Sequence, residues 1–443
     1  MGPERRHHTT RSRRHSLAVA GILLLTMALL AAGVSEAQLL GRGRGEDESE
    51  GPEGRWRMAR PEHRSTMTDA QRAEIERLRS IGYLSGSQAA PEISGVTIHV
   101  PDRVESGVNF VLSGHRPGAA LIDMNGRVLH EWSRSFTEIF RGHEQETDEE
   151  NAQYWRAAHL FENGDVISIF EGLGIFKVDA NSNVVWAKYN GAHHDLQVLD
   201  DGRICTLTRD AHIVRRINPN TPILEDFIEI LDAEGNSLKR VSVLEAFENS
   251  TFSNAMSVLG MRRIGDIFHT NSVQCLDGSL AETIPAFKKG NVLISLRKLS
   301  VVAVVDMELG EVVWAMSGLW NAQHMPRMLP NGNMLVFDNL GNNDRSRIIE
   351  FDPVTQAVEW VYQGARPEDF YTQMCGANHR LRNGNTLIVE SDFGRAFEVD
   401  EDGEIVWEFI NPERAGRKQE LIGTLFDVRR IPPSFPLSWA SSR

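Results

Sequence analysis

The stretch QHMPRMLPNGNMLVFDN, Gln323–Asn339, predicts a β-hairpin that recurs along the chain. Its turn, Leu329-Pro330-Asn331-Gly332, separates two apolar runs, and Asn-Gly favours a tight hairpin because both residues tolerate positive φ. Related hairpins occupy residues 194–208, 378–391, 159–169 and, with an insertion between the strands, 269–297. The chain is therefore expected to be built from repeated antiparallel strand pairs.

A second hairpin unit alternates with the first. Its first copy is ALIDMNGRVLHEW, residues 120–132, and five of its six copies end in Trp. The other copies occupy residues 178–186, 230–239, 305–314, 351–360 and 399–407. Two hairpins give four antiparallel strands, and such units repeated every roughly 40–75 residues are typical of a β-propeller. Six copies predict an all-β, six-bladed β-propeller.

The end of the chain predicts how the ring closes. Phe426–Pro433 aligns with His324–Pro330, whereas the first blade lacks an inner hairpin of the usual form. The C-terminal strand is therefore expected to complete blade one, which removes the free sheet edges. The propeller is expected to span residues 93–436.

The N-terminal segment has the features of an export signal. Residues 1–37 combine a basic region, an apolar run and a Ser-Glu-Ala end, which indicates a cleavable signal peptide, with an uncleaved membrane anchor as the alternative. Residues 12–17 partly resemble a twin-arginine signal. Residues 38–92 are expected to form a linker with a short helix, capped by Thr68 and Gln71 and ended by Gly82. These features predict a periplasmic or secreted protein, anchored to the membrane if the leader is retained.

Net charge and cysteine content limit the partners and the cross-links. The net charge of −14 argues against a nucleic-acid partner, which requires a basic face. Cys205, Cys275 and Cys375 lie in or beside predicted strands, which favours buried free thiols, with one disulfide as the alternative. The sequence does not give the oligomeric state.

Strand phase predicts which side chains face the central channel, because side chains alternate between two faces with a period of two. The apolar residue before each inner turn serves as the reference, and residues an odd number of positions upstream share one parity. Residues of this parity are expected to converge near one mouth: Arg156, His194, His269, Asn271 and His324. His159 and His379 have the opposite parity and should not join them.

The second strand of each inner hairpin returns to the same mouth and adds Arg209, Arg297 and Asn339. Three imidazoles with nearby guanidinium groups suit a tetrahedral or planar oxyanion. Three histidines also suit zinc, but a guanidinium repels a cation, so we expect no metal. Arg209 has a structural alternative as well, because its neighbour Asp210 could pair with it.

An ordered set of short motifs resembles a known family. The motifs are His193-His194-Asp195, His269-Thr270-Asn271-Ser272, Ser295-Leu296-Arg297 and Gln323-His324. Together they resemble the bacterial arylsulfate sulfotransferases that do not use a nucleotide sulfate donor. The resemblance extends over roughly residues 95–433, beginning with GVTIHVP at residues 95–101 and the unit at residues 120–132.

The resemblance implies roles for matching positions. His324 matches the histidine that is transiently sulfated, His194, His269 and Arg297 match the catalytic residues around it, and Asn271 matches by motif. Arg156, Arg209 and Asn339 are expected to contact substrate. The implied reaction moves a sulfuryl group from an aryl sulfate to a phenol by a ping-pong route and needs no cofactor.

Two departures from the family pattern and two rival functions accompany this hypothesis. The N-terminal β-segment, residues 95–112, is shorter than in many members, and Gly376-Ala377-Asn378 supplies no obvious polar channel side chain. A non-catalytic propeller could bind a ligand or a partner protein at the same mouth. A quinone-dependent dehydrogenase is also a Trp-rich propeller, but it requires more blades and a carboxylate calcium site. The natural donor and acceptor are not given by the sequence.

Overall fold

The computed structural model describes residues 68, 70–71, 86, 88–143, 151–259, 264–341, 345–366, 369–416 and 418–440. They all belong to the second of two compact units, Thr66–Arg443. The predicted leader, most of the predicted linker and the end of its helix at residue 82 lie outside the described residues. The predicted helix cap is present, because the backbone N–H of Thr68 donates to Oε1 of Gln71 and the backbone N–H of Gln71 to Oγ1 of Thr68, over 2.9 and 3.1 Å.

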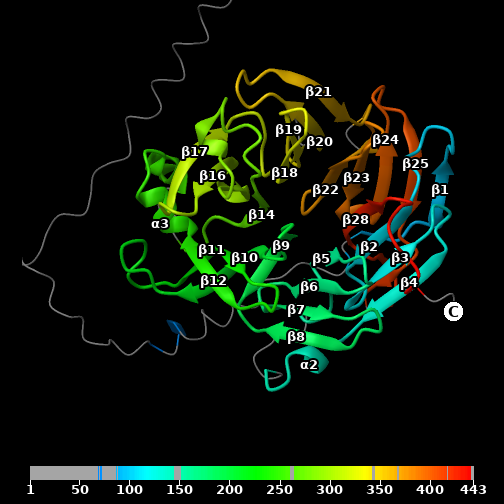
Figure 1. The fold of residues 1–443 in the computed structure, drawn as a ribbon, viewed down its shortest axis with the longest axis horizontal. Helices are drawn as coiled ribbons and strands as arrows, with labels where there is room; N and C mark the ends of the chain where they lie inside the picture. The colour runs from blue at the N-terminus through cyan, green and yellow to red at the C-terminus, as the bar shows by residue number, and fades with distance from the viewer. Residues whose placement is uncertain are drawn as a thin grey trace, which may run out of the picture. The chain divides into compact units, whose positions relative to one another are not determined.

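Six blades, each built on four antiparallel strands, form a ring around a central channel, as the repeats predicted (Figure 1). Blades one to three contain, from the inner strand outward, β28 (Leu425–Ile431), β2 (Val108–Ser113), β3 (Gly118–Ile122) and β4 (Val128–Ser133); β5 (Ala157–Leu160), β6 (Val166–Phe170), β7 (Gly174–Val178) and β8 (Val184–Lys188); and β9 (Ala192–Val198), β10 (Ile204–His212), β11 (Ile223–Leu231) and β12 (Ser237–Ser242).

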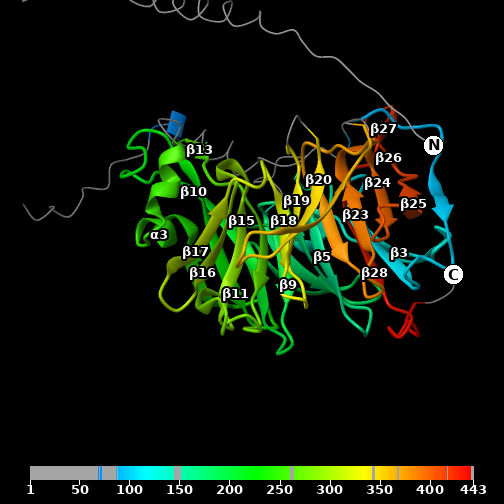
Figure 2. The same ribbon diagram turned by 90° about the horizontal axis from the view of Figure 1, so that it is seen from above.

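Blades four to six follow the same order. They contain β14 (Thr270–Cys275), β15 (Val292–Leu296), β16 (Val301–Asp306) and β17 (Glu311–Ser317); β18 (His324–Met328), β19 (Met334–Asp338), β20 (Arg347–Phe351) and β21 (Val358–Gln363); and β22 (Ala377–Arg380), β23 (Thr386–Glu390), β24 (Arg395–Val399) and β25 (Ile405–Ile410). Figure 2 shows the strands side on, running along the axis of the ring.

Two strands from the ends of the propeller segment close the ring. The C-terminal β28 pairs antiparallel with β2 and forms the inner strand of blade one, which confirms the predicted closure. β1 (Gly95–His99) pairs antiparallel with β25 and adds a fifth, outer strand to blade six. In Figure 1 the blue-cyan β1 accordingly lies beside the orange β25. The short N-terminal β-segment is therefore part of the propeller.

The hydrophobic core is divided into layers between neighbouring blades. Among the described residues, six apolar clusters form, and each fills the space between two adjacent sheets. The outer-strand Trp residues join these layers: the indole N–H of Trp132, Trp186, Trp360 and Trp407 each donates to a backbone carbonyl of the next blade, over 3.0–3.2 Å. The repeated Trp is therefore a packing residue that ties blade to blade.

Short helices and strands lie in the described connections between the blade strands. The helical segments are α2 (Phe136–Ile139), α3 (Val243–Glu248), η1 (Ser253–Leu259), η2 (Pro285–Phe287), η3 (Arg297–Leu299) and η5 (Ser391–Phe393). β13 (Gly265–Asp266) pairs parallel with β11, and β26 (Arg414–Ala415) pairs with β27 (Leu421–Ile422). No helix in the described part of the chain has the length and hydrophobicity that crossing a membrane requires. Cys205, Cys275 and Cys375 are free thiols.

Candidate active site

The inner strands of all six blades contribute to one small polar pocket in the channel. Its lining residues are Arg156, Ala157, His194, Asp195, Asn271, His324, Met325, Gly376, Ala377, Phe426, Asp427 and Arg429. The volume is ≈ 30 Å³, which corresponds to about two water-sized groups. The pocket therefore accepts the oxygens of a small anion more readily than a whole aromatic ester.

His324, the first residue of β18, presents one ring nitrogen to this pocket and is held by the other. Its Nδ1 lies 2.7 Å from Oδ1 of Asn339. The side-chain amide of Asn339 donates to the carbonyl oxygens of Thr372 and Cys375, over 3.0 and 2.6 Å. Because these two acceptors fix the orientation of the amide, Oδ1 faces His324 and must accept its Nδ1 proton.

The remaining nitrogen of His324, Nε2, is buried and has no hydrogen-bond partner. Burial, and secondarily the positive charge of Arg297, hold the pKa of His324 well below its usual value. The imidazole is therefore neutral at neutral pH, with its proton on Nδ1 and a lone pair on Nε2. A buried lone pair of this kind is the feature expected of a nucleophile.

His194 and His269 come from neighbouring blades and contact one another. Their Nε2 atoms are 3.3 Å apart, so a single proton can lie between them. Nδ1 of His269 is in short contact with Oδ2 of Asp266, whose Oδ1 also accepts the backbone N–H of His269 over 2.9 Å. Burial alone would raise the pKa of Asp266, but the neighbouring His269 lowers it below its usual value. The pair is thus arranged to hold and transfer one proton.

Glu171 anchors the second side of His194. Its Oε2 accepts the backbone N–H of His194 over 3.0 Å, and its Oε1 lies 3.3 Å from Nδ1 of the same residue. Arg209 and Arg156 approach the carboxylate at 3.4 and 3.9 Å. Glycine suits position 172, where φ is 71° and a Cβ would lie 2.0 Å from the guanidinium of Arg209 and displace it. The cluster fixes two guanidinium groups beside the histidines.

Bulges in the inner strands aim these side chains. The pairing of β9 with β10 skips His194 and Asp195, and the pairing of β14 with β15 skips Asn271. β18 and β28 carry comparable register shifts, after His324 and at Phe426. His194, His269 and Met325 take left-handed φ values of 58°, 52° and 48°. Such backbone is costly for residues other than glycine and often occurs at active sites.

These bulges correct the phase rule used on the sequence. His159 and His379 stay apart from the histidine cluster, as predicted, but they do line the channel. Both belong to a second pocket of ≈ 440 Å³ that shares Met325 and Arg429 with the first. β14, β18 and β28 each have one residue more than their partner strand at the bulge, whereas β5 and β22, which contain His159 and His379, pair without a register shift. Parity counted from the turn therefore does not select the same face in every blade.

Asn271 lines the small pocket, whereas Arg297 lies outside its lining. Nδ2 of Asn271 donates to the carbonyl of Gln323 over 2.9 Å, while its buried Oδ1 has no partner. Nη2 of Arg297 donates to the carbonyl of Gln373 over 3.2 Å, and this side chain is partly exposed. Arg297 does not line the ≈ 30 Å³ pocket, but its charge acts on His324.

One wall of the pocket is apolar. Phe426, Gly376 and Ala377 line it, and the Arg156 guanidinium stands 5.0 Å from the centroid of the Phe426 ring. Blade six supplies only backbone and a methyl group here, as its sequence indicated. This wall offers an aromatic group a place to pack beside the cationic and histidine-rich side.

Several residues of the site were not predicted from the sequence. They are Glu171, His193, Asp195, Asp226, Asp266 and Asp427. A signal for Glu171 was present, because it lies five residues after the start of its strand, as Arg209, Arg297 and Asn339 do. Asp226 and Asp266 lie on β11 and β13, outside the inner hairpins to which the phase rule applies.

A metal site is a poor fit to these residues. Glu171, His193 and His194 offer ligand atoms within 4.8 Å of one another. However, the two guanidinium groups beside Glu171 repel a cation, and the Nδ1 atoms of His193 and His194, 2.6 Å apart, share a hydrogen bond. Two nitrogens that share a proton cannot both donate lone pairs to a metal.

Comparison with known proteins links this geometry to one family. The arylsulfotransferase (ASST) family model matches residues 157–412. No curated protein matches the chain. Similar solved structures include a protein of unknown function from Bacteroides caccae, with 13% identity, a TM-score of 0.48 and coverage of 72% of this chain and 98% of that one. Another is virginiamycin B lyase from Staphylococcus aureus, with 10% identity, a TM-score of 0.36 and coverage of 58% and 70%.

Proposed function

We propose a specific reaction for this chain, which belongs to the arylsulfotransferase (ASST) family. Membership supports an arylsulfotransferase-type function, with an aryl sulfate as donor and a phenol as acceptor. In our proposal the sulfuryl group passes through a covalent sulfohistidine on Nε2 of His324. The observation that carries the proposal is the buried, unpartnered Nε2 of His324, with the ring's single proton fixed on Nδ1 by Asn339.

The first half-reaction forms the covalent intermediate. The lone pair of Nε2 attacks sulfur, an N–S bond forms, and the S–O bond to the aryl group breaks with its electron pair moving to the aryl oxygen. The proton shared by His194 and His269 moves to that oxygen, so the product leaves as a neutral phenol. His324 keeps its Nδ1 proton throughout, hydrogen-bonded to Oδ1 of Asn339.

The second half-reaction is the reverse with another phenol. The acceptor oxygen attacks sulfur and returns its proton to the His194–His269 pair, and the N–S bond breaks with its electron pair returning to Nε2. Since an aryl sulfate is both consumed and produced, the exchange is nearly balanced in energy and needs no cofactor.

Positive charge and hydrogen-bond donors stabilise the sulfuryl oxygens during transfer. Sulfuryl transfer resembles phosphoryl transfer, in which the protein chiefly positions the nucleophile and neutralises charge on equatorial oxygens. We assign this role to Arg297 and to Arg156, which lines the pocket. Arg209 acts indirectly, through its contact with Glu171. The amide of Asn271 lies at the pocket wall.

The proposed cellular location follows from the N-terminal segment, residues 1–37. A donor that is an aryl sulfate is accessible to an exported enzyme, whereas a nucleotide sulfate is cytosolic. We therefore propose a periplasmic or secreted enzyme, with the retained leader as a membrane anchor if it is not cleaved.

The test is a transfer assay with the purified protein. Para-nitrophenyl sulfate and phenol are incubated with the wild type and with His324→Ala. We expect phenol-dependent release of nitrophenol and formation of phenyl sulfate by the wild type and neither by the variant. With donor alone, mass spectrometry should show one added sulfuryl group on the peptide that contains His324.

Other outcomes would replace the proposal. Release of inorganic sulfate without a phenol requirement would indicate a sulfatase. No release from folded protein with any of several phenols would favour the non-catalytic binding propeller. Activity retained by His324→Ala would exclude His324 as the nucleophile.

A further inference from the structure

We propose that His193 and Asp226, which the reaction above does not use, are positioning residues that extend the His194–His269 pair into a proton relay. The relay runs through five side chains: Asp226, His193, His194, His269 and Asp266. This inference rests on the proposed sulfuryl transfer and concerns how its proton is supplied and stored.

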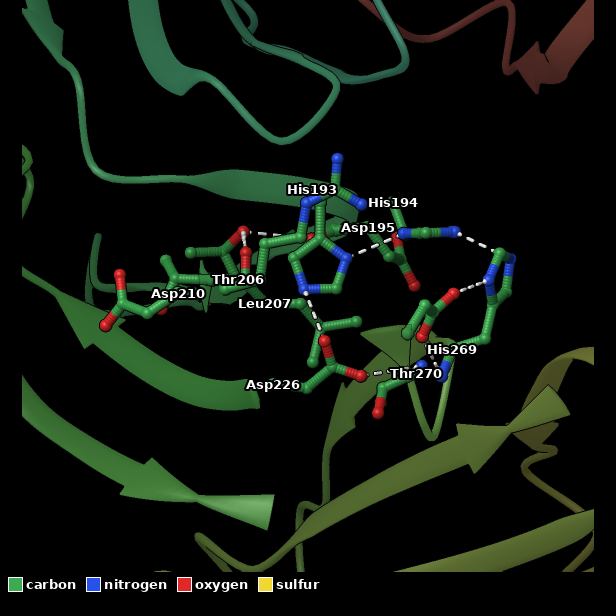
Figure 3. Close-up of polar contacts among 12 residues, drawn as sticks. His193, His194, Asp195, Thr206, Leu207, Asp210, Asp226, His269 and Thr270 are labelled. Atoms are coloured by element: carbon green, nitrogen blue, oxygen red, sulfur yellow. Dashed lines mark hydrogen bonds and ion pairs between the residues drawn. The ribbon is translucent and has the colours of Figure 1, made fainter. Parts of the chain in front are cut away.

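The five side chains form a path from the buried carboxyl group of Asp226 to the partly buried one of Asp266. Figure 3 labels four of them, Asp226, His193, His194 and His269. Nε2 of His193 faces Oδ1 of Asp226 at 3.7 Å. Nδ1 of His193 lies 2.6 Å from Nδ1 of His194, whose Nε2 lies 3.3 Å from Nε2 of His269. The final contact joins Nδ1 of His269 to Asp266.

The geometry couples the protonation of neighbouring rings. Only one proton fits between the two Nδ1 atoms of His193 and His194, and only one between the Nε2 atoms of His194 and His269. A neutral His194 with its proton on Nε2 must therefore accept the Nδ1 proton of His193. Moving either proton requires the other to move if His194 is to stay neutral.

This coupling answers a difficulty of the proposed reaction. Burial, followed by the neighbouring His269, holds the pKa of His194 well below its usual value, so the ring is neutral at neutral pH. A neutral imidazole that gave up its Nε2 proton alone would become an anion in a buried site. Reprotonation of Nδ1 by His193 in the same step avoids that charge.

Asp226 is suited to the far end of the path. It is 2% exposed, and its Oδ2 accepts the backbone N–H of Thr270 over 2.9 Å. Burial and the negative charge of Asp266 raise the pKa of Asp226 to about 7. Nε2 of His193 is buried and has no hydrogen-bond partner, so a proton from Asp226 has a place to go.

The complete step balances. The leaving aryl oxygen takes the Nε2 proton of His194, the Nδ1 proton of His193 moves to Nδ1 of His194, and the carboxyl proton of Asp226 moves to Nε2 of His193. Asp226 is left as a carboxylate. The acceptor phenol reverses each transfer, so no proton is exchanged with solvent over a full cycle.

One other group could supply the proton that Nδ1 of His194 takes up. Oε1 of Glu171 lies 3.3 Å from Nδ1 of His194, farther than Nδ1 of His193. Two arginines and the backbone N–H of His194 already contact the Glu171 carboxylate. The shorter contact, 2.6 Å between the two Nδ1 atoms, makes His193 the proton donor to His194.

The experiment compares His193→Asn and Asp226→Asn with the wild type on aryl sulfates whose phenols differ in acidity. Asn can keep a hydrogen bond to Nδ1 of His194, but an amide does not relay a proton. In each variant we expect the loss of kcat/KM on phenyl sulfate to exceed the loss on para-nitrophenyl sulfate by roughly 10-fold or more. Phenol is the poorer leaving group, so its departure depends more on protonation by a general acid. The solvent deuterium isotope effect on phenyl sulfate should also change.

His159→Asn is the matched control, since this histidine lines the second pocket and lies outside the relay. Thermal unfolding checks that each variant folds. If His193→Asn does not fold, the nearly isosteric Asp226→Asn provides the test of the relay. Losses that are equal for both donors would show a merely structural role and overturn the relay. A wild type without phenol-dependent transfer would instead overturn the proposed function.

Discussion

The side-chain oxygen of Asn339 accepts a hydrogen bond from Nδ1–H of His324 over 2.7 Å. The amide of Asn339 cannot flip, because its NH₂ group donates to two backbone carbonyls. The nitrogen that faces the pocket is thereby kept unprotonated. Asn339 directly follows β19, as Arg297 directly follows β15, so the repeated blade structure places both residues at the site.

Replacing Asn339 should impair transfer without abolishing donor binding. In Asn339→Ala the ring of His324 can carry its proton on either nitrogen, and the Nε2-protonated form cannot attack. We expect kcat to fall about 100-fold or more, as for other changes that remove the group fixing a catalytic tautomer. Steady-state kinetics with para-nitrophenyl sulfate and phenol measure this. Asn236→Ala, in an exposed outer turn, should keep wild-type kcat, and a similar loss in both variants would contradict the prediction.

The pH dependence should report the lowered pKa of His324. Because the nucleophile must be neutral, kcat/KM should fall only when pH drops below the usual histidine pKa of about 6.5. Arg297→Met removes one of the causes of the lowered pKa. In that variant the acidic limb of kcat/KM should move to higher pH, and activity should also fall because the sulfuryl oxygens lose a cation.

Arg203→Met is the control for this profile, because Arg203 is half exposed in the turn between β9 and β10 and pairs with Asp201. Its acidic limb should coincide with that of the wild type. An unshifted limb in Arg297→Met would show that Arg297 does not set the pKa of the group that limits activity.

Much of the fold could be predicted from the sequence because its signals are local and repeated. Asn-Gly turns, alternating strands and a Trp at the end of five of the six outer hairpins identify the blades. One additional copy of the inner strand, at residues 426–433, predicts how the ring closes. The residues that converge on the channel follow from the same repeat. Glu171 follows from it too, at the strand position shared with Arg209.

The rest of the site depends on features that a repeat does not encode. The bulges at His194, Asn271 and Phe426 change which face a side chain occupies, and only the pairing with the neighbouring strand reveals them. Asp226 and Asp266 reach the histidines from β11 and from β13, a short strand beyond an insertion. Their contacts with His193 and His269 are tertiary.

Stability should decrease in mild acid, in part through His159. Burial, followed by the charge of Arg429, lowers the pKa of His159 to about 4. Between pH 4 and about 6.5 the unfolded chain binds a proton at this residue and the folded protein does not, so stability falls as pH falls through this window. Because the side chain is not fully buried, we expect about 1–2 kcal/mol.

Urea unfolding at pH 7 and pH 5 tests this, with His159→Gln expected to lose less stability on acidification than the wild type. His99→Gln, on the outer strand β1, should behave like the wild type. An unchanged pH dependence in His159→Gln would contradict the assignment.

Ring closure should depend on a buried ion pair between blades one and six. Nη1 of Arg430, in β28, lies 2.9 Å from Oε2 of Glu398, and the two side chains are 1% and 0% exposed. Nε of Arg430 also donates to Oδ1 of Asn109 over 2.7 Å. In Arg430→Met the Glu398 carboxylate stays buried without its cation, so unfolding free energy should fall by about 3–5 kcal/mol. Denaturant unfolding measures the loss.

Arg127→Met, which breaks an exposed pair, should change stability by less than about 0.5 kcal/mol. Equal, small effects in both variants would show that the closing strand is held by its ladder with β2 and by apolar packing alone.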